Sequence, residues 1–158
     1  MKLRRVSGGV VIKFIQGKQY VLLIQRAPDD HFPLRYEFPR GGCDANESIY
    51  DTVKREIKEE TNLDVELKKL IDTTEYINND KNQKNIQFNF LCKRKNPNQE
   101  VVLSHEHSDY KWVESVGELE LMLNTDVRKT ITKVFEKFRQ LINYDFEDYE
   151  EDKHKISE

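Results

Sequence analysis

Residues Gly41–Leu63 read GGCDANESIYDTVKREIKEETNL, and they contain the most regular pattern in the chain. Within them Ile49, Val53 and Ile57 recur every four residues. That spacing places the three side chains on one side of an α-helix. We therefore expect a helix over Ser48–Thr61 that buries this aliphatic stripe.

Residues at both ends of the stretch support these helix boundaries. Asn46 and Ser48 are residue types that cap a first turn, and Glu47 favours the positive end of the helix dipole. Asn62 follows the last periodic residue, where a left-handed backbone conformation usually requires Gly or Asn. The helix should therefore end at Thr61.

Three glutamates lie on or beside the buried stripe of this helix. At about 100° per residue, Glu60 falls inside the aliphatic arc, Glu56 lies at its edge, and Glu59 lies one step further round. An ionised carboxylate turned toward a core is costly unless a positive group meets it. The pattern therefore requires a cationic partner for this cluster.

Two kinds of partner satisfy that requirement. One is a structural salt bridge to Arg55 or to a distant lysine, since charged runs on helices are commonly solvated faces. The other is a divalent cation, because Mg²⁺ prefers oxygen ligands and binds through carboxylates, water and phosphate. The helix alone does not distinguish the two.

Outward from the helix, the pattern predicts an α/β domain. We expect a hairpin at the start, a loop rich in proline and aspartate, a short strand before the glycine pair, three strands after the helix, and two C-terminal helices. These segments are Val6–Ile15 with Gln19–Gln25, Ala27–Arg35, Tyr36–Phe38 leading into the flexible residues 39–42, Val65–Ile77, Asn85–Arg94, Asp109–Val113, Val116–Asn124 and Asp126–Tyr144.

Length and composition indicate one globular domain. The chain has 158 residues, 37% of them hydrophobic and 35% charged, and we place the domain at residues 1–144 and an acidic, disordered tail at 145–158. A net charge of −3 argues against a protein that coats nucleic acid. No apolar run is long enough for a bilayer, and two isolated cysteines favour a reducing interior, so we expect a cytoplasmic protein.

The same stretch resembles a known family signature, the Nudix box G-x5-E-x7-R-E-U-x-E-E-x-G-U, where U is aliphatic. The matching residues are Gly41, Glu47, Arg55, Glu56, Ile57, Glu59, Glu60 and Leu63. The resemblance implies a Nudix-type α/β/α sandwich with a mixed β-sheet between helices. It departs from the box at Asn62, where the family usually has Gly; Asn tolerates a positive φ, so we expect a modest loss of stability.

Membership of the Nudix family would assign the glutamates to a metal site. The resemblance implies that Glu56, Glu59 and Glu60 bind Mg²⁺ or Mn²⁺, joined by the backbone carbonyl of Arg40. The reaction it implies is hydrolysis of a pyrophosphate linkage in a nucleotide-derived substrate. Cations suit that chemistry because they offset the charge of the phosphates and lower the pKa of bound water.

The resemblance also implies catalytic and supporting roles. Arg55 would hydrogen-bond to Glu47 and orient the cluster, with Gly41 as a structural residue of the site. A carboxylate must accept the proton of the attacking water. Glu56 is the first candidate for this base and Glu106 the second, although Glu106 also fits a solvated loop acid.

Residues after the helix narrow the substrate class. The segment Leu103–Trp112 resembles the corresponding stretch of dinucleoside tetraphosphate hydrolases. That resemblance implies that Tyr76 stacks on a base and that Lys81 or Lys84 contacts phosphate. His107, which flanks Glu106 together with His105, would lie near phosphate; the alternatives are a plain surface residue of the loop and a metal ligand. A tyrosine packed on the sheet and lysines in water are the alternatives.

Other segments of the sequence are compatible with further substrates. Phe38–Gly42 looks closer to RNA 5′-pyrophosphohydrolases, so a dinucleoside polyphosphate or an RNA 5′-end pyrophosphate ranks first. Capped RNA, nucleoside triphosphates in a house-cleaning role and ADP-ribose follow. A non-catalytic nucleotide-binding module is the alternative from another class, although such modules usually lack one of the box glutamates. The pattern does not indicate an oligomeric state.

Overall fold

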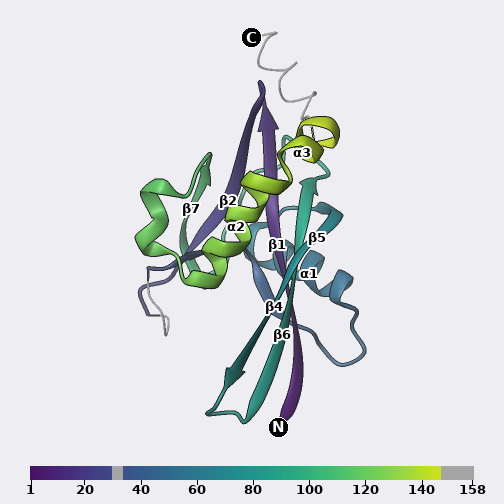
Figure 1. The fold of residues 1–158 in the computed structure, drawn as a ribbon, viewed down its shortest axis with the longest axis vertical. Helices are drawn as coiled ribbons and strands as arrows, with labels where there is room; N and C mark the ends of the chain where they lie inside the picture. Colours follow the sequence, from purple (N-terminus) through teal and green to yellow (C-terminus); the bar gives the residue numbers. More distant parts are fainter. Residues whose placement is uncertain (30–33, 147–158) are drawn as a thin grey trace.

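The computed structural model describes residues 1–29 and 34–146, which form one mixed β-sheet with helices on both faces (Figure 1). Its elements, in chain order, are β1 (Lys2–Ile15), β2 (Lys18–Arg26), β3 (Tyr36–Glu37), β4 (Arg40–Gly42), α1 (Ile49–Thr61), β5 (Val65–Asn78), β6 (Gln83–Arg94), β7 (His107–Val113), the 3-10 helix η1 (Gly117–Met122), α2 (Thr125–Lys137) and α3 (Arg139–Asp145).

The central strand β1 has neighbours on both sides. The order of strands in the sheet is β3-β2-β1-β6-β5, with β4 also paired to β1 and β7 to β2. The β1–β6 pair is parallel and the other pairs are antiparallel. A central strand buried on both faces reads as a continuous apolar run, which explains the sequence of β1 after Gly8.

Alternate residues of β1 face two separate cores. Val10 and Ile12 belong to a core that α2 covers with Val127, Ile131 and Val134. On the opposite face, Val11 packs with Val53 and Ile57 of α1. The expected sandwich of a mixed sheet between helices is therefore confirmed, and α1 lies behind the sheet in the view of Figure 1.

The C-terminal helices differ from the sequence-based prediction. The helix expected over Asp126–Tyr144 is interrupted at Phe138, whose φ of −111° ends α2 and precedes α3. The buried Gln19 side chain donates to the carbonyl oxygen of Arg139 and to Asn143 at this point. The break was not predictable from composition, because Phe138 is neither Pro nor Gly. The segment expected as a helix over Val116–Asn124 contains the 3-10 helix η1.

Other boundaries of the elements and of the domain also differ from those predicted. Arg40–Gly42, expected as part of a flexible loop, forms β4 because it pairs with β1. Asp145 ends α3, and Phe146 is buried in the core, so the packed domain extends two residues past the expected boundary. The rest of the expected tail, and residues 30–33 of the expected loop, lie outside the described residues. Among the helices described, none is long and apolar enough to cross a membrane.

Candidate active site

Helix α1 carries the glutamate cluster, and its position is set by caps and by close packing on β1. Ser48 caps the first turn by accepting a hydrogen bond from the amide of Asp51 at 3.0 Å. Asn62 ends the helix in the left-handed conformation, with φ of 67°, as the sequence predicts. A Cβ at Gly9 would lie 2.5 Å from Ile57 Cδ1, so only glycine permits this approach.

The three glutamates of α1 differ in burial in the order predicted from the helical wheel. Glu60 is only 6% exposed, whereas the side chains of Glu56 and Glu59 are 15% and 57% exposed. Glu59 lies on the outer edge, where its carboxylate is 3.3 Å from Arg55. The helix therefore turns one carboxylate fully inward and a second partly inward.

Glu60 is a buried acid with no cationic partner among the described residues. Its Oε2 accepts a hydrogen bond from the backbone amide of Arg40 at 3.1 Å. No Lys, Arg or His forms an ion pair with it within residues 1–29 and 34–146. Burial, followed by the negative charges of Glu56, Glu37 and Glu106, raises the pKa of Glu60 to about 9. Such a group calls for an external positive charge.

The backbone of Arg40 points toward this acid. In the β1–β4 ladder, Gly9 N donates to Pro39 O and Cys43 N donates to Arg5 O, both at 2.9 Å. Antiparallel ladders make these bonds at alternate residues, so the amide and carbonyl of Arg40 both face away from β1. The amide reaches Glu60, and the carbonyl faces the same side.

Glu56 lies against the backbone of β4. A Cβ on Gly41 would fall 2.1 Å from Glu56 Cδ, so the missing side chain leaves the space that this carboxylate fills. Arg55 Nη1 donates to Glu56 Oε1 at 2.9 Å. Burial is the largest influence and raises the pKa of Glu56; the charge of Arg55 opposes it, and those of Glu59 and Glu106 add to it.

Arg55 and Glu47 form the pair that the family resemblance implied. Arg55 Nε and Nη2 donate to the two carboxylate oxygens of Glu47 at 2.9 and 3.0 Å. Thr52 Oγ1 and the amide of Asp44 also donate to Glu47. Chiefly through the hydrogen bond from Arg55, the pKa of Glu47 falls to about 2. Arg55 is thus fixed as a bridge between the loop before α1 and Glu56.

The loop that carries Glu106 docks on the end of α1. Ser104 N donates to the carbonyl oxygen of Glu60 at 3.3 Å, and Ala27 N donates to that of Glu106 at 3.0 Å. Glu106 is exposed, and the structure gives its carboxylate no ion pair within the described ranges. One oxygen of Glu106, one of Glu60 and a ring nitrogen of His107 lie within 4.8 Å of one another. The family resemblance had placed Glu106 at this site, whereas the position of His107 close to Glu60 was not predicted.

A buried acid next to the cluster was not identified from the sequence. Glu37 is 5% exposed, and its carboxylate meets Arg26 at 3.0 Å, Arg40 at 3.3 Å and His107 Nε2 at 3.0 Å. Burial raises the pKa of Glu37, but the His107 hydrogen bond and the two arginine charges together hold it below its usual value. The available signal was a charged residue between Tyr36 and Phe38 in a strand that is otherwise apolar.

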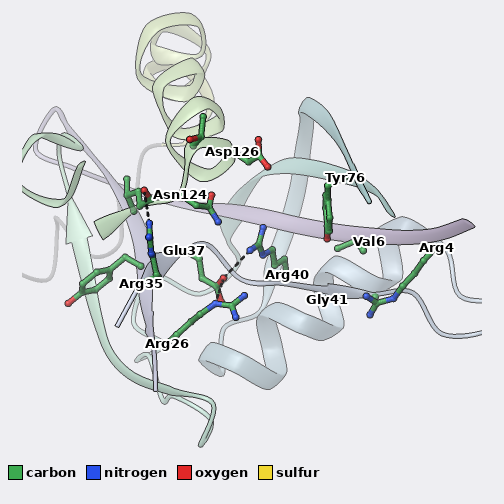
Figure 2. Close-up of a pocket in the computed structure, with 14 residues that line it drawn as sticks. Arg4, Val6, Arg26, Arg35, Glu37, Arg40, Gly41, Tyr76, Asn124 and Asp126 are labelled. Atoms are coloured by element: carbon green, nitrogen blue, oxygen red, sulfur yellow. Dashed lines mark hydrogen bonds and ion pairs between the residues drawn. The ribbon is translucent and has the colours of Figure 1, made fainter. Parts of the chain in front are cut away.

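A cleft of about 740 Å³ opens beside the cluster, on the face of the sheet that α2 covers (Figure 2). Four arginines, two tyrosines and the N-terminal residues of α2 line it: Arg4, Val6, Arg26, Arg35, Tyr36, Glu37, Arg40, Gly41, Gly42, Tyr76, Leu123, Asn124, Thr125 and Asp126. Arg40 and Gly41 belong both to this lining and to the contacts of Glu60 and Glu56. The cleft and the carboxylates therefore adjoin.

The structure brings together only some of the residues expected to bind substrate. Tyr76 lines the cleft and is 36% exposed. Lys81 and Lys84 are not among the described lining residues, and Lys84 Nζ lies 3.4 Å from Glu75 Oε2. His107 is buried beside Glu37. Among the arginines of the cleft, Arg40 was singled out for its backbone carbonyl alone; the side chains of all four converge from segments distant in sequence, which no local pattern indicates.

The donor set of the cluster fits a divalent cation. Carboxylates are the ligands that Mg²⁺ and Mn²⁺ prefer, and an imidazole is also acceptable to Mn²⁺. Glu60 supplies a buried carboxylate that meets no cationic side chain in the part of the chain that the structure describes, and Glu106 and His107 supply donors close by. A cation held there would neutralise the charge that burial makes costly.

Comparison with known proteins identifies the family. Residues 3–138 match the family model of the NUDIX domain. A bis(5′-nucleosyl)-tetraphosphatase (asymmetrical) of Caenorhabditis elegans is 30% identical over 113 residues, which are 70% of this chain and 78% of that enzyme. The chain therefore belongs to the Nudix family, and it is a Nudix pyrophosphohydrolase.

Solved structures agree with this assignment. A C. elegans Ap4A hydrolase in a binary complex has a TM-score of 0.67 and 26% identity, covering 82% of this chain and 93% of that one. A MutT Nudix hydrolase from Burkholderia pseudomallei has a TM-score of 0.69 at 20% identity, covering 85% and 99% of the two chains. The Nudix domain of Shewanella oneidensis NrtR, crystallised with ADP ribose, has a TM-score of 0.66 at 21% identity, covering 87% and 89%. The last two are likenesses of fold alone.

Proposed function

We propose that this enzyme hydrolyses a pyrophosphate linkage of a dinucleoside polyphosphate with the help of Mg²⁺ or Mn²⁺. One observation carries the proposal: Glu60, buried and without an ion pair in the described chain, adjoins a cleft lined by four arginines. A buried acid that has no cationic partner in the described chain thus lies next to positive charge suited to a polyphosphate.

The cation would be held at the inner end of the glutamate cluster. Glu60 and the backbone carbonyl of Arg40 lie on the same side of β4, with Glu56 and Glu106 close to them. Glu59 would join this acidic set from the outer edge, where it now pairs with Arg55. A bound cation would offset the charge of the diphosphate bridge and lower the pKa of water. Arg55 supports this arrangement by holding Glu56 in place.

Proton transfer falls to a carboxylate at the rim of the cleft. A water oxygen forms a new bond to phosphorus, the bridging P–O bond breaks, and the bridging oxygen leaves with the second phosphate-containing product. Glu56 accepts the proton of this water, because its carboxylate fills the space over Gly41, which lines the cleft. Glu106 is the second candidate for this base.

Cleft residues would bind the rest of the substrate. Arg26 and Arg40 are already paired with Glu37, whereas the side chains of Arg4 and Arg35 have no carboxylate partner within the described residues, so these two suit phosphate contact. Tyr76 presents an aromatic face for stacking on a base. A cleft of about 740 Å³ lies within the usual range for small-molecule sites.

The relatives support a dinucleoside polyphosphate over other substrates. The curated enzyme that matches over most of its length is a bis(5′-nucleosyl)-tetraphosphatase. A substrate of that class offers two bases and a polyphosphate, which matches Tyr76 and the arginines in one cleft. An RNA 5′ end would use the same phosphate contacts, so it is the main competitor in the test.

A substrate panel tests the proposal. The protein is incubated with Mg²⁺ and diadenosine tetraphosphate, triphosphorylated RNA, ADP-ribose or a nucleoside triphosphate in ¹⁸O-labelled water, and products are measured by mass. We expect the fastest turnover with diadenosine tetraphosphate and label in one phosphate product. Faster turnover of RNA would overturn the substrate assignment. Binding without turnover under either metal would make the chain a nucleotide-binding module.

A further inference from the structure

The buried imidazole of His107 has one nitrogen in use and one without a partner. The side chain is 3% exposed, and Nε2 lies 3.0 Å from Glu37 Oε2. Nδ1 is fully buried, and none of the residues described forms a hydrogen bond with it. A buried polar atom without a partner is costly, so it requires an explanation.

Glu37 determines which nitrogen carries the proton. The two arginines that neutralise Glu37 keep it ionised, and an ionised carboxylate only accepts hydrogen bonds. Nε2 must therefore donate to it. In a neutral imidazole this leaves Nδ1 as a lone pair, which is the form that binds metals.

The surroundings of His107 supply the other ligands. A ring nitrogen of His107 and carboxylate oxygens of Glu60 and Glu106 lie within 4.8 Å of one another. The three residues come from the end of α1, the loop after β6 and the start of β7. Backbone hydrogen bonds of Ser104 join the first of these segments to the last. Ser104 O accepts from His107 N at 3.3 Å, and Ser104 N donates to Glu60 O at the same distance. Ser104 therefore links Glu60 to His107 through the backbone.

We propose that His107 Nδ1 is a direct ligand of the divalent cation, together with Glu60 and Glu106. The inference rests on the metal site of the proposed function and adds a nitrogen to its oxygen ligands. Glu37 then takes the place of the carboxylate that commonly lies behind a metal-bound histidine, where it orients the ring and raises its basicity. This role replaces the phosphate contact expected for His107.

A nitrogen ligand changes the metal preference of the site. Imidazole suits transition metals, whereas Mg²⁺ prefers oxygen ligands alone. The enzyme should therefore bind Mn²⁺ more tightly than Mg²⁺, and the ratio of the two affinities should shrink in His107→Gln. A His107 that only braces Glu37 would leave that ratio unchanged.

Pulsed EPR of Mn²⁺ bound to the full chain tests the inference. We expect a ¹⁴N coupling to the metal in the wild type. His107→Gln should remove the coupling and weaken Mn²⁺ binding about 10-fold or more. The matched control is His105→Gln, at an exposed position two residues away, which should keep both the coupling and the affinity.

A second variant avoids any change at the buried position. Substituting the other three histidines, His31, His105 and His154, by Gln leaves His107 as the only imidazole, and the ¹⁴N coupling should persist. Tight Mn²⁺ binding without nitrogen coupling in the wild type would overturn the inference and leave the proposed function standing. Absence of any Mn²⁺ binding would overturn both.

Discussion

Arg55 donates to both carboxylate oxygens of Glu47, at 2.9 and 3.0 Å, and through Nη1 to Glu56 at 2.9 Å. Its Nη2 also reaches the carbonyl oxygen of Gly42 at 3.2 Å. One guanidinium therefore fixes the loop before α1, the end of β4 and a candidate catalytic carboxylate relative to one another. The planar shape of arginine makes this possible.

Arg55→Lys should lower kcat with little change in KM. Lysine keeps the charge but cannot donate in two directions at once, so Glu56 loses its fixed position. A loss of about 10–100-fold is typical for a partner that supports a metal site. Steady-state kinetics measures it. Lys58→Ala is the control, because among the described residues the Lys58 ammonium contacts Asp64 and the Asn62 carbonyl, just past the end of α1, and no residue of the candidate site. An unchanged kcat in Arg55→Lys would contradict this role.

Gly41→Ala should lower kcat and leave the melting temperature nearly unchanged. The new methyl group would overlap the carboxylate of Glu56 at 2.1 Å, and that flexible side chain would move away from the cleft rim. Gly117→Ala is a matched control, since its nearest neighbouring atom would be 3.8 Å away. Turnover is measured as kcat and stability by thermal melting. An equal kcat in the two variants would show that the position of Glu56 is unimportant.

Tyr76→Ala should chiefly raise KM. Stacking on a base contributes about 1–3 kcal/mol by alanine substitution, which corresponds to roughly a 5–150-fold change. Tyr144→Ala removes a tyrosine that is 91% exposed on α3, and it should leave KM unchanged. If Tyr76→Ala instead lowered kcat at constant KM, the side chain would act in the chemical step and not in stacking.

The metal-free enzyme should lose stability as pH rises from about 5 to about 8. The folded pKa of Glu60 is about 9, well above its unfolded value, so the folded state binds more protons than the unfolded state across this window. Glu47 does not mask the effect, because its pKa of about 2 makes its contribution complete above pH 5. Melting temperatures recorded over this pH range, with a chelator present to remove metal, measure how stability changes with pH. Glu60→Gln should make the melting temperature less dependent on pH. An equal dependence in both proteins would refute its assignment to Glu60.

The sequence allowed the local part of the site to be predicted. Helical periodicity alone placed Glu60 inward and Glu59 outward, and the structure agrees. The left-handed Asn62 followed in the same way from its place after the last periodic residue. Each of these features depends on neighbours within a turn or two of the chain.

Contacts between distant segments could not be predicted in this way. The Arg40 amide donates to Glu60, 20 residues away in sequence, and Glu37 forms a hydrogen bond with His107, 70 residues away. Hydrophobic periodicity along the chain predicts neither contact. The family resemblance supplied the Glu47–Arg55 pair but no role for Glu37. Tertiary packing also buried His107 beside Glu37, whereas the family resemblance implied a place for it near phosphate.

Calorimetric titration of the metal-free enzyme with Mn²⁺, in the wild type and in Glu60→Gln, tests the metal site most directly. The change removes the carboxylate that can ionise to bind the cation, and it keeps the volume of the side chain. We predict measurable binding in the wild type and a loss of affinity in Glu60→Gln of at least about 100-fold, at the upper end of the range for supporting partners. Equal affinity in the two proteins would contradict the account.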